Sequence, residues 1–191
     1  GVDIWEQPKK IRDLRFKVGL VFQYPEYQLF DETVRKDISF GPKNMRMSEE
    51  QIERAVEKAA KTVGLSEEML EKSPFDLSGG QKRRAALAGV LAMKPKVLVL
   101  DEPTAGLDPK GRDEILDQIA HLQKEGDLTV ILVSHSMEDI AKYVDRIIVM
   151  NGGKVAFDDE PKKVFSHYKE LEAIGLAAPQ ITYIMHALKE K

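Results

Sequence analysis

The 191-residue sequence contains no cysteine, which excludes a disulfide framework and any metal site built from thiolates. Long hydrophobic runs are also missing. The longest, over residues 85–93, is far shorter than the ~20 residues that a membrane-spanning helix needs. The first residues show no basic stretch followed by an apolar core, so they do not resemble a signal peptide. These absences are compatible with a cytosolic protein.

An excess of one sign of charge is absent too, because 29 Lys and Arg stand against 32 Asp and Glu and give a net charge of −3. This balance argues against nucleic-acid binding as the main function. With 42% hydrophobic and 32% charged residues, the composition is that of an ordinary globular protein. The length suits one domain, or one domain with an extension.

Strand-like and helix-like patterns alternate along most of the chain. Short apolar runs predict strands over residues 18–22, 97–100 and 129–133. Capping residues and helical spacing predict helices over residues 49–63, 81–94, 109–126 and 137–144, and a helical tail from residue 161. Residues 146–150 and 154–158 predict a β-hairpin, whose turn takes up the Gly-Gly-Lys at 152–154. The order predicts an α/β fold with a mostly parallel sheet covered on both faces.

Polar residues fall just after the expected strands, at the sheet edge where open α/β folds bind ligands. They are Gln23, Asp101, Glu102, Ser134 and His135. Of the adjacent carboxylates, one can face a metal ion while the other faces a reacting water, as phosphoryl transfer requires. The alternatives are that Asp101-Glu102-Pro103 simply ends a strand, and that His135 is a structural histidine. The combination of these residues with Asp108 favours the site.

A second pattern, Ser78-Gly79-Gly80-Gln81, stands at the start of a predicted helix. Glycines there let the backbone approach an anion, and the free N–H groups and the helix dipole can hold it. The alternative is an ordinary loop before a helix. The basic residues that follow, Lys82, Arg83 and Arg84, are interpreted as a solvated helix face. Taken with the carboxylates, the pattern predicts a site for a nucleoside triphosphate and Mg²⁺.

These motifs together resemble those of the ATP-binding cassette (ABC) ATPases. Residues 77–81 match the signature motif, residues 97–102 the Walker B strand with its catalytic glutamate, and residues 105–108 the D-loop. Gln23 matches the Q-loop glutamine and His135 the switch histidine. The finer pattern is similar to the ATPase subunits of energy-coupling factor (ECF) transporters, especially the second of the two. Residues 23–30, 32–34, 40–44 and 161–180 carry that likeness.

The resemblance implies a P-loop NTPase-like core with a helical subdomain. Residues 1–23 and 95–158 would form the remaining part of the RecA-like core, residues 24–94 the helical signature subdomain, and residues 159–191 the start of a C-terminal helical extension. The N-terminal P-loop unit is lacking, since no G-x-x-x-x-G-K-[ST] loop occurs. We expect that loop to lie before Gly1, and residues 1–4 to end a hairpin segment that follows it. The chain alone is then expected not to hydrolyse ATP, and apolar side chains of its sheet to be exposed.

The resemblance also implies roles for single residues. Ser78, Gly79, Gly80, Gln81 and Asp108 would bind nucleotide; Asp101 and Gln23 would bind Mg²⁺; Glu102, His135 and Gln23 would be catalytic. Two cassettes, paralogues by this likeness, would pair head to tail around two ATP molecules. A transmembrane coupling subunit would dock on residues 24–30 and the helical segment after them, and a separate membrane subunit would choose the substrate. The protein would lie on the cytoplasmic face of the membrane, with no nucleic-acid partner.

Three rival functions remain open. Chromosome-maintenance and DNA-repair ATPases share the motifs, but they insert long coiled coils where residues 24–77 are expected to hold one capped helix and short turns. Translation-associated cassette ATPases normally carry two cassettes and a charged linker, and neither is visible. A non-catalytic interaction module is the third, and an ATP hydrolysis assay would separate it from an enzyme.

Overall fold

The computed structural model describes residues 3, 5–6, 11–126 and 128–189. Most of the hairpin segment expected at residues 1–4 therefore lies outside the described residues. The chain divides into two compact units, Gly1–Val133 and Ser134–Lys191. The finer division predicted at residues 23, 94 and 158 stays a prediction.

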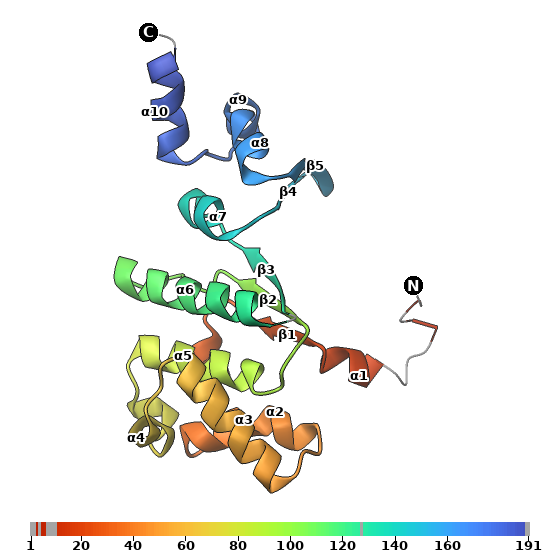
Figure 1. Ribbon diagram of the computed structural model, residues 1–191, viewed down its shortest axis with the longest axis vertical. Helices are drawn as coiled ribbons and strands as arrows, with labels where there is room; N and C mark the ends of the chain where they lie inside the picture. The colour runs from red at the N-terminus through yellow and green to blue at the C-terminus, as the bar shows by residue number, and fades with distance from the viewer. Residues whose placement is uncertain (1–2, 4, 7–10, 127, 190–191) are drawn as a thin grey trace. The chain divides into compact units, whose positions relative to one another are not determined.

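The first unit is built on a three-stranded parallel sheet in the order β1-β2-β3 (Figure 1). Its strands are β1 (Val18–Val21), β2 (Val97–Asp101) and β3 (Thr129–Val133). The three predicted strands and their parallel direction are thereby confirmed. In the register, Val21 lies opposite Leu100 and Asp101 lies opposite Val133. The carboxyl ends of all three strands therefore meet at one edge.

One face of this sheet is buried, because alternate residues of each strand point to opposite sides. Leu98 and Leu100 of the central strand are fully buried, and helix α6 (Pro109–Glu125) contributes Ile115 and Ile119 to the same core. On the other face Leu20, Ile131 and Val133 are 41%, 48% and 49% exposed. The exposed apolar side chains expected from the sequence are present. Among the described residues of the first unit, helices cover one face of the sheet, whereas the sequence predicted cover on both.

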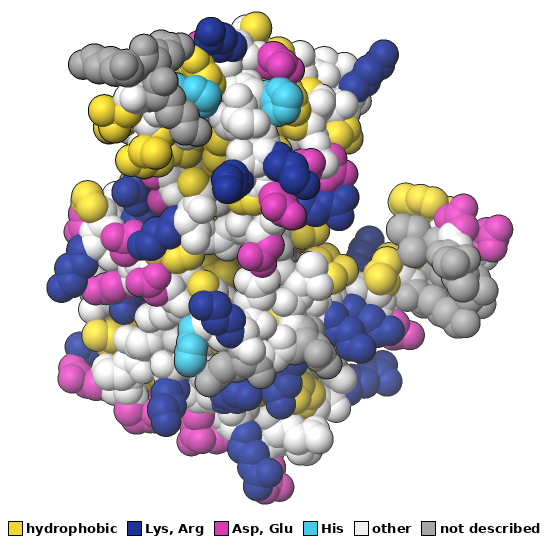
Figure 2. Space-filling model, turned by 45° about the horizontal axis from the view of Figure 1, so that its top comes forward, with side chains coloured by type: hydrophobic (Ala, Val, Ile, Leu, Met, Phe, Trp, Pro, Cys, Tyr) yellow, Lys and Arg dark blue, Asp and Glu magenta, His cyan; other side chains and the backbone are white. Residues whose placement is uncertain are grey.

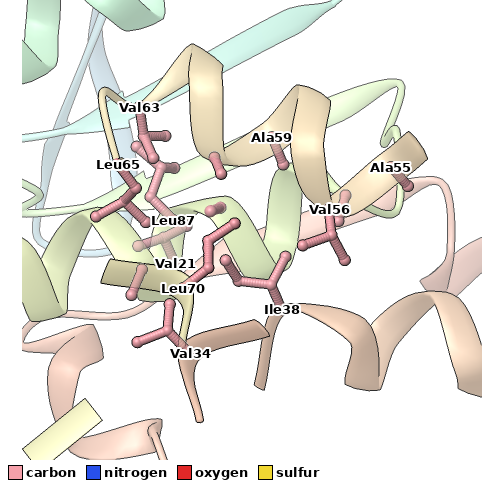
Figure 3. Packing of buried hydrophobic residues seen from close by; sticks show 14 of the residues in the cluster. Val21, Val34, Ile38, Ala55, Val56, Ala59, Val63, Leu65, Leu70 and Leu87 are labelled. Carbon is pink, nitrogen blue, oxygen red and sulfur yellow. The ribbon is translucent and has the colours of Figure 1, made fainter. Parts of the chain in front are cut away.

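A helical layer packs against the buried face. It contains η2 (Pro25–Gln28), α2 (Val34–Asn44), α3 (Glu49–Thr62), α4 (Glu67–Leu70), η3 (Pro74–Asp76) and α5 (Gly79–Leu91). Figure 3 shows Val21, Ile38, Val56 and Leu70 gathered in the core that these elements share. Helix α3 opens with the predicted capping box: Ser48 Oγ accepts from Gln51 N at 3.3 Å, and Gln51 Oε1 accepts from Ser48 N at 3.0 Å.

The expectation of one capped helix between residues 24 and 77 is wrong, because α2 is a second helix of 11 residues. Pro42 lies inside α2. A proline in a sequence normally argues against a helix there, because it has no backbone N–H to donate. Gly41 is explained by packing, since a Cβ at this position would come within 2.6 Å of Met93 Cγ. The cap is Thr33, whose Oγ1 accepts from Lys36 N at 3.2 Å. The longest helix in this segment, α3, has 14 residues, so no long coiled coil is present there.

The second unit combines a hairpin with short helices: α7 (Met137–Tyr143), β4 (Ile147–Asn151), β5 (Lys154–Asp159), α8 (Pro161–Ser166), α9 (Tyr168–Ala173) and α10 (Gln180–Lys189). Strands β4 and β5 are antiparallel, and their turn has Gly152 at φ 56° and Gly153 at φ 74°, which glycine adopts without strain. The predicted hairpin and helical tail are confirmed. Val164 and Leu171 lie at the centre of this unit's own core.

Helix α1 (Ile11–Arg15), which no sequence pattern predicted, precedes β1 in the first unit. Within the described residues, none of the helices combines the length and the apolar character that crossing a bilayer requires. Figure 2 shows acidic, basic and hydrophobic side chains interspersed on the visible face.

Candidate functional site

Three predicted site residues meet at the carboxyl edge of the sheet. Gln23 follows the end of β1 by two residues, while Asp101 ends the neighbouring strand β2 and Glu102 comes next. Because Val21 lies opposite Leu100, the carboxyl ends of β1 and β2 are level with each other along the sheet. Gln23 is exposed, and both carboxylates are half-buried. The structure thus brings one amide and two carboxylates to the edge at which open α/β sheets bind ligands.

The backbone of Glu102 has an unusual conformation, with φ at 46° in the left-handed region. A residue with a Cβ pays roughly 1–2 kcal/mol there. The conformation is held from both sides: Glu102 N donates to Val133 O of β3 at 2.9 Å, and Glu102 O accepts from Ala105 N at 3.1 Å. The chain thus turns immediately after Asp101. Strain of this kind concentrates at functional sites, where surrounding structure maintains it.

The predicted anion site lies at the start of α5. Ser78 Oγ accepts from Gln81 N at 3.4 Å, and Gln81 Oε1 accepts from Ser78 N at 2.9 Å. Because the hydroxyl oxygen is the acceptor in this capping box, its proton stays available for an external acceptor. The amides of Gly79 and Gly80 belong to the first turn, whose N–H groups have no partner inside the helix.

The space around Gly79 and Gly80 is open. A Cβ built on Gly79 or on Gly80 meets nothing within 4 Å, so crowding within the chain does not demand glycine at either. Ser78 and Gly79 are exposed. The helix start can therefore receive an anionic group that approaches its backbone closely.

Asp108 begins the next helix as its cap. Its Oδ1 accepts from Gly111 N at 2.7 Å, and Pro109 occupies the first helical position. The carboxylate is exposed. The predicted cap is confirmed, and the stretch of residues 102–108 forms a short loop between the sheet edge and α6.

Comparison with known proteins decides the family. A family model described as "ABC transporter" matches residues 2–105, more than half of the chain. The chain belongs to the ABC transporter family. The family expected from the signature, Walker B and D-loop residues is thereby confirmed.

Relatives extend the likeness over the whole chain. A protein of Clostridium tetani named "Energy-coupling factor transporter ATP-binding protein EcfA2" is 61% identical over 191 residues, which are all of this chain and 66% of that protein. Proteins of the same name from Clostridium perfringens and Caldanaerobacter subterraneus are 59% and 55% identical, each over all of this chain and 67% of the relative. The chain thus spans about two thirds of their length.

A solved ABC transporter structure shares the fold. The cbiO1 protein of Clostridium perfringens, described as part of the ABC transporter complex cbiONQ, matches with a TM-score of 0.77 and 43% identity. The match covers 93% of this chain and 70% of the solved chain. The α/β fold with a parallel sheet and flanking helices, predicted from the ABC ATPase resemblance, is confirmed.

His135, which matches the switch histidine of ABC ATPases, belongs to the second unit and is exposed. It follows the last residue of β3 by two positions. Its place opposite Asp101 and Glu102, and the roles of all the named site residues, stay predictions.

The interpretation of Lys82, Arg83 and Arg84 as a solvated face is wrong. Arg83 is only 4% exposed and forms an ion pair with Glu26, Nη2 to Oε1 at 3.1 Å. Arg84 forms an ion pair with Glu114 of α6, and Lys82 is half-buried. Helix α5 is packed on several sides, so no polar stripe separates a solvent face from a core face. The sequence offered no signal for the pair, because its partners lie 57 positions apart.

The donors at this edge would suit a magnesium ion that arrives with a phosphate-bearing ligand. No group of three or more His, Cys, Asp or Glu in the described part of the chain could hold a metal by itself. Mg²⁺ typically uses one or two carboxylates together with substrate phosphates and water. Asp101 with the amide of Gln23 fits that set.

Proposed function

We propose that the intact subunit, meaning a chain that joins these residues to a phosphate-binding loop, hydrolyses ATP to drive an ECF-type importer of a vitamin or a metal ion. The observation that carries the proposal is the pair Asp101 and Glu102 at the carboxyl end of β2, beside the strand that leads to Gln23. Identity of 61% along the whole chain to a named ECF transporter ATP-binding protein supports it.

In this proposal the site residues divide the work. Asp101, with Gln23, binds the Mg²⁺ of Mg·ATP, Glu102 polarises the attacking water, and His135 donates a hydrogen bond to the terminal phosphate. Water activation and electrostatic stabilisation of the transferred group are the two tasks that phosphoryl transfer requires.

The signature residues serve a second nucleotide. Ser78 and Gly80 bind the γ-phosphate of the nucleotide held by a partner cassette, and Gly79 and Gln81 belong to the same nucleotide-binding turn. Asp108 helps to join the two sites across a head-to-tail interface. The partner is a paralogous ATPase subunit. The exposed N-terminal turn of α5, with its glycines open to approach, supports this arrangement.

The proposed assembly lies on the cytoplasmic face of the membrane. A transmembrane coupling subunit receives the movement, and a separate membrane subunit binds the imported substrate. Nucleic acid is not a partner in this proposal. Helices of at most 14 residues between Gln23 and Ser78 support a transporter ATPase over the coiled-coil ATPases of DNA repair.

Glu102→Gln tests the enzyme in the assembled transporter. It keeps the size of the side chain and removes the carboxylate, so ATP turnover should fall ~100-fold or more, with ATP binding retained. Glu49→Gln is the matched control, because Glu49 is an exposed carboxylate at the start of α3 and belongs to no proposed site. It should leave turnover unchanged. Full turnover in Glu102→Gln would refute the assigned role.

A separate assay tests residues 1–191 alone. We propose that they do not turn over ATP, because no phosphate-binding loop occurs in their sequence. The measurement is phosphate release at saturating Mg·ATP. Turnover of ~1 s⁻¹ or more, within the ordinary range of enzymes, would contradict this part of the proposal. A non-catalytic interaction module would instead show no turnover in the intact subunit either.

A further inference from the structure

We infer that Arg83 is a positioning residue that links the exposed aromatic turn η2 to the loop after Glu102, so that a displacement of one is transmitted to the other. The guanidinium group contacts both segments at once. Nη2 and Nε donate to the Glu26 carboxylate at 3.1 and 3.3 Å, and Nη1 donates to the carbonyl oxygens of Pro103, at 3.4 Å, and Ala105. The consequence of this link for catalysis rests on the proposed function.

Burial makes this contact hard to break. The side chain of Arg83 is 5% exposed and that of Glu26 is 18% exposed. Removing one partner of a buried ion pair leaves an uncompensated charge, which is strongly unfavourable. The two segments are therefore held at fixed positions relative to the guanidinium group, and neither can move far without it.

Arginine is the residue that can make both contacts. Its planar group carries five donors in a rigid fork, so one edge can bind a carboxylate while the opposite nitrogen binds carbonyl groups. A lysine ammonium is a point charge that can pair with Glu26 but does not span the same distance. Arg83→Lys is thus expected to keep the ion pair and lose the link.

The two linked segments face different surroundings. Tyr27 of η2 is 85% exposed, and Tyr24, the residue just before η2, is 43% exposed, so this turn presents aromatic surface outward. The loop begins one residue after the strained Glu102 and continues to Asp108. A partner that presses on η2 would consequently shift the loop beside the carboxylates. Arg83 couples an outer surface to the sheet edge.

The neighbouring pair of Arg84 with Glu114 provides a matched control. It also joins α5 to another element, in this case α6, and both side chains are at most 40% exposed. It includes no atom of η2 or of the loop at residues 103–105. A general loosening of α5 would result from breaking either pair, but only the Arg83 pair should connect η2 to the loop.

Hydrogen exchange in the intact subunit tests the link without requiring ATP hydrolysis. The amides of Ala105 and Leu107 are hydrogen-bonded within the loop. Glu26→Gln should raise exchange at these amides at least fivefold, although Glu26 does not contact them. In the Arg83→Lys background the same Glu26→Gln change should have no further effect. Glu114→Gln should leave the loop within twofold of wild type.

An effect of Glu26→Gln confined to η2 would overturn the inference, and so would an undiminished effect in the Arg83→Lys background. If Arg83→Lys does not fold, the single variant Glu26→Gln still decides the matter. The matching functional readout is the ratio of ATP turnover with and without the transmembrane subunit. Arg83→Lys should lower this ratio at least fivefold, whereas a loss of folded protein would leave it unchanged. Absence of turnover in the wild-type assembly would contradict the proposed function and leave the exchange result standing.

Discussion

Ser78 and Gln81 each bind the other's backbone amide, at 3.4 Å for the hydroxyl and 2.9 Å for the amide oxygen. This reciprocal pair starts α5 and fixes the hydroxyl at the exposed end of the helix. The same side chain thus stabilises the fold and faces the space where we place a partner's γ-phosphate. Two substitutions can separate these contributions.

Ser78→Ala and Ser78→Asp should differ in stability and agree in activity. Alanine removes the cap and should cost ~1 kcal/mol in the free energy of unfolding, whereas aspartate caps helices as well as serine does and should cost little. Aspartate places a negative charge against the phosphate, so both variants should lose most ATP turnover in the assembled transporter. Urea unfolding and phosphate release measure the two quantities. Normal turnover in Ser78→Asp would exclude a phosphate at this helix start.

Glu102→Gly should make the chain more stable and the enzyme inactive. Glycine adopts φ 46° without the penalty that a Cβ brings, so the free energy of unfolding should rise by about 1 kcal/mol. The matched variant Glu102→Gln keeps the Cβ and should leave stability near that of wild type. Thermal unfolding of the three chains compares them. Equal stability of Glu102→Gly and Glu102→Gln would show that the strain relieved by glycine does not exceed the entropy that glycine adds to the unfolded chain.

Asp37→Asn should remove a decline in stability with rising pH. Asp37 is 9% exposed, and its Oδ2 accepts the amides of Phe30 and Asp31 at 3.0 and 2.9 Å. Burial raises the pKa of Asp37, against the effect of these two hydrogen bonds. The folded state then holds the proton more tightly than the unfolded state, so stability falls as pH rises from 3.8 through the raised pKa.

The asparagine oxygen can accept the same two bonds and carries no charge. The free energy of unfolding of Asp37→Asn, minus that of wild type, should therefore grow as pH rises from 3.8 through the raised pKa of Asp37, by at most ~1.4 kcal/mol per pH unit. Urea unfolding across this range measures it, with Glu49→Gln as an exposed control. A difference that shrinks with rising pH would reverse the sign assigned to Asp37.

The elements that the sequence predicted are those whose signals are local. Ser48 with Gln51, and Asp108 with Pro109, fix where helices begin, and the Gly152-Gly153 turn fixes the hairpin. Each depends on residues within about four positions of one another. The carboxyl edge followed from the same reasoning, because short apolar strands in a parallel sheet end together. The sequence therefore predicted which polar residues lie at this edge, whereas their positions and backbone conformations required the structure.

The features that sequence reasoning missed depend on distant partners. Helix α2 contains Gly41 and Pro42, and its place is explained by packing against α5 and by the contact with Met93. Arg83 has the sequence context of a surface charge, but its partner Glu26 comes from a distant segment and the pair is buried. The positive φ of Glu102 is likewise set by hydrogen bonds to Val133 and Ala105. Tertiary context decides all three, and no local pattern encodes it.

Tyr27→Ala should weaken docking without changing stability. The side chain of Tyr27 is 85% exposed, and its ring lies 6.2 Å from that of Tyr24. Truncation of so exposed a side chain should change the free energy of unfolding by less than ~0.5 kcal/mol. Exposed aromatic residues often dominate the binding energy of an interface, so affinity for the transmembrane coupling subunit should fall about fivefold or more.

The control is Met150→Ala on β4, whose side chain is 59% exposed and which lies in the other unit. Binding of each variant to the transmembrane subunit in lipid nanodiscs gives the comparison. If Tyr27→Ala binds as wild type does while Met150→Ala binds weakly, docking takes place on the second unit. The link through Arg83 would then begin at a surface that no subunit touches, and its input would have to come from elsewhere on the chain.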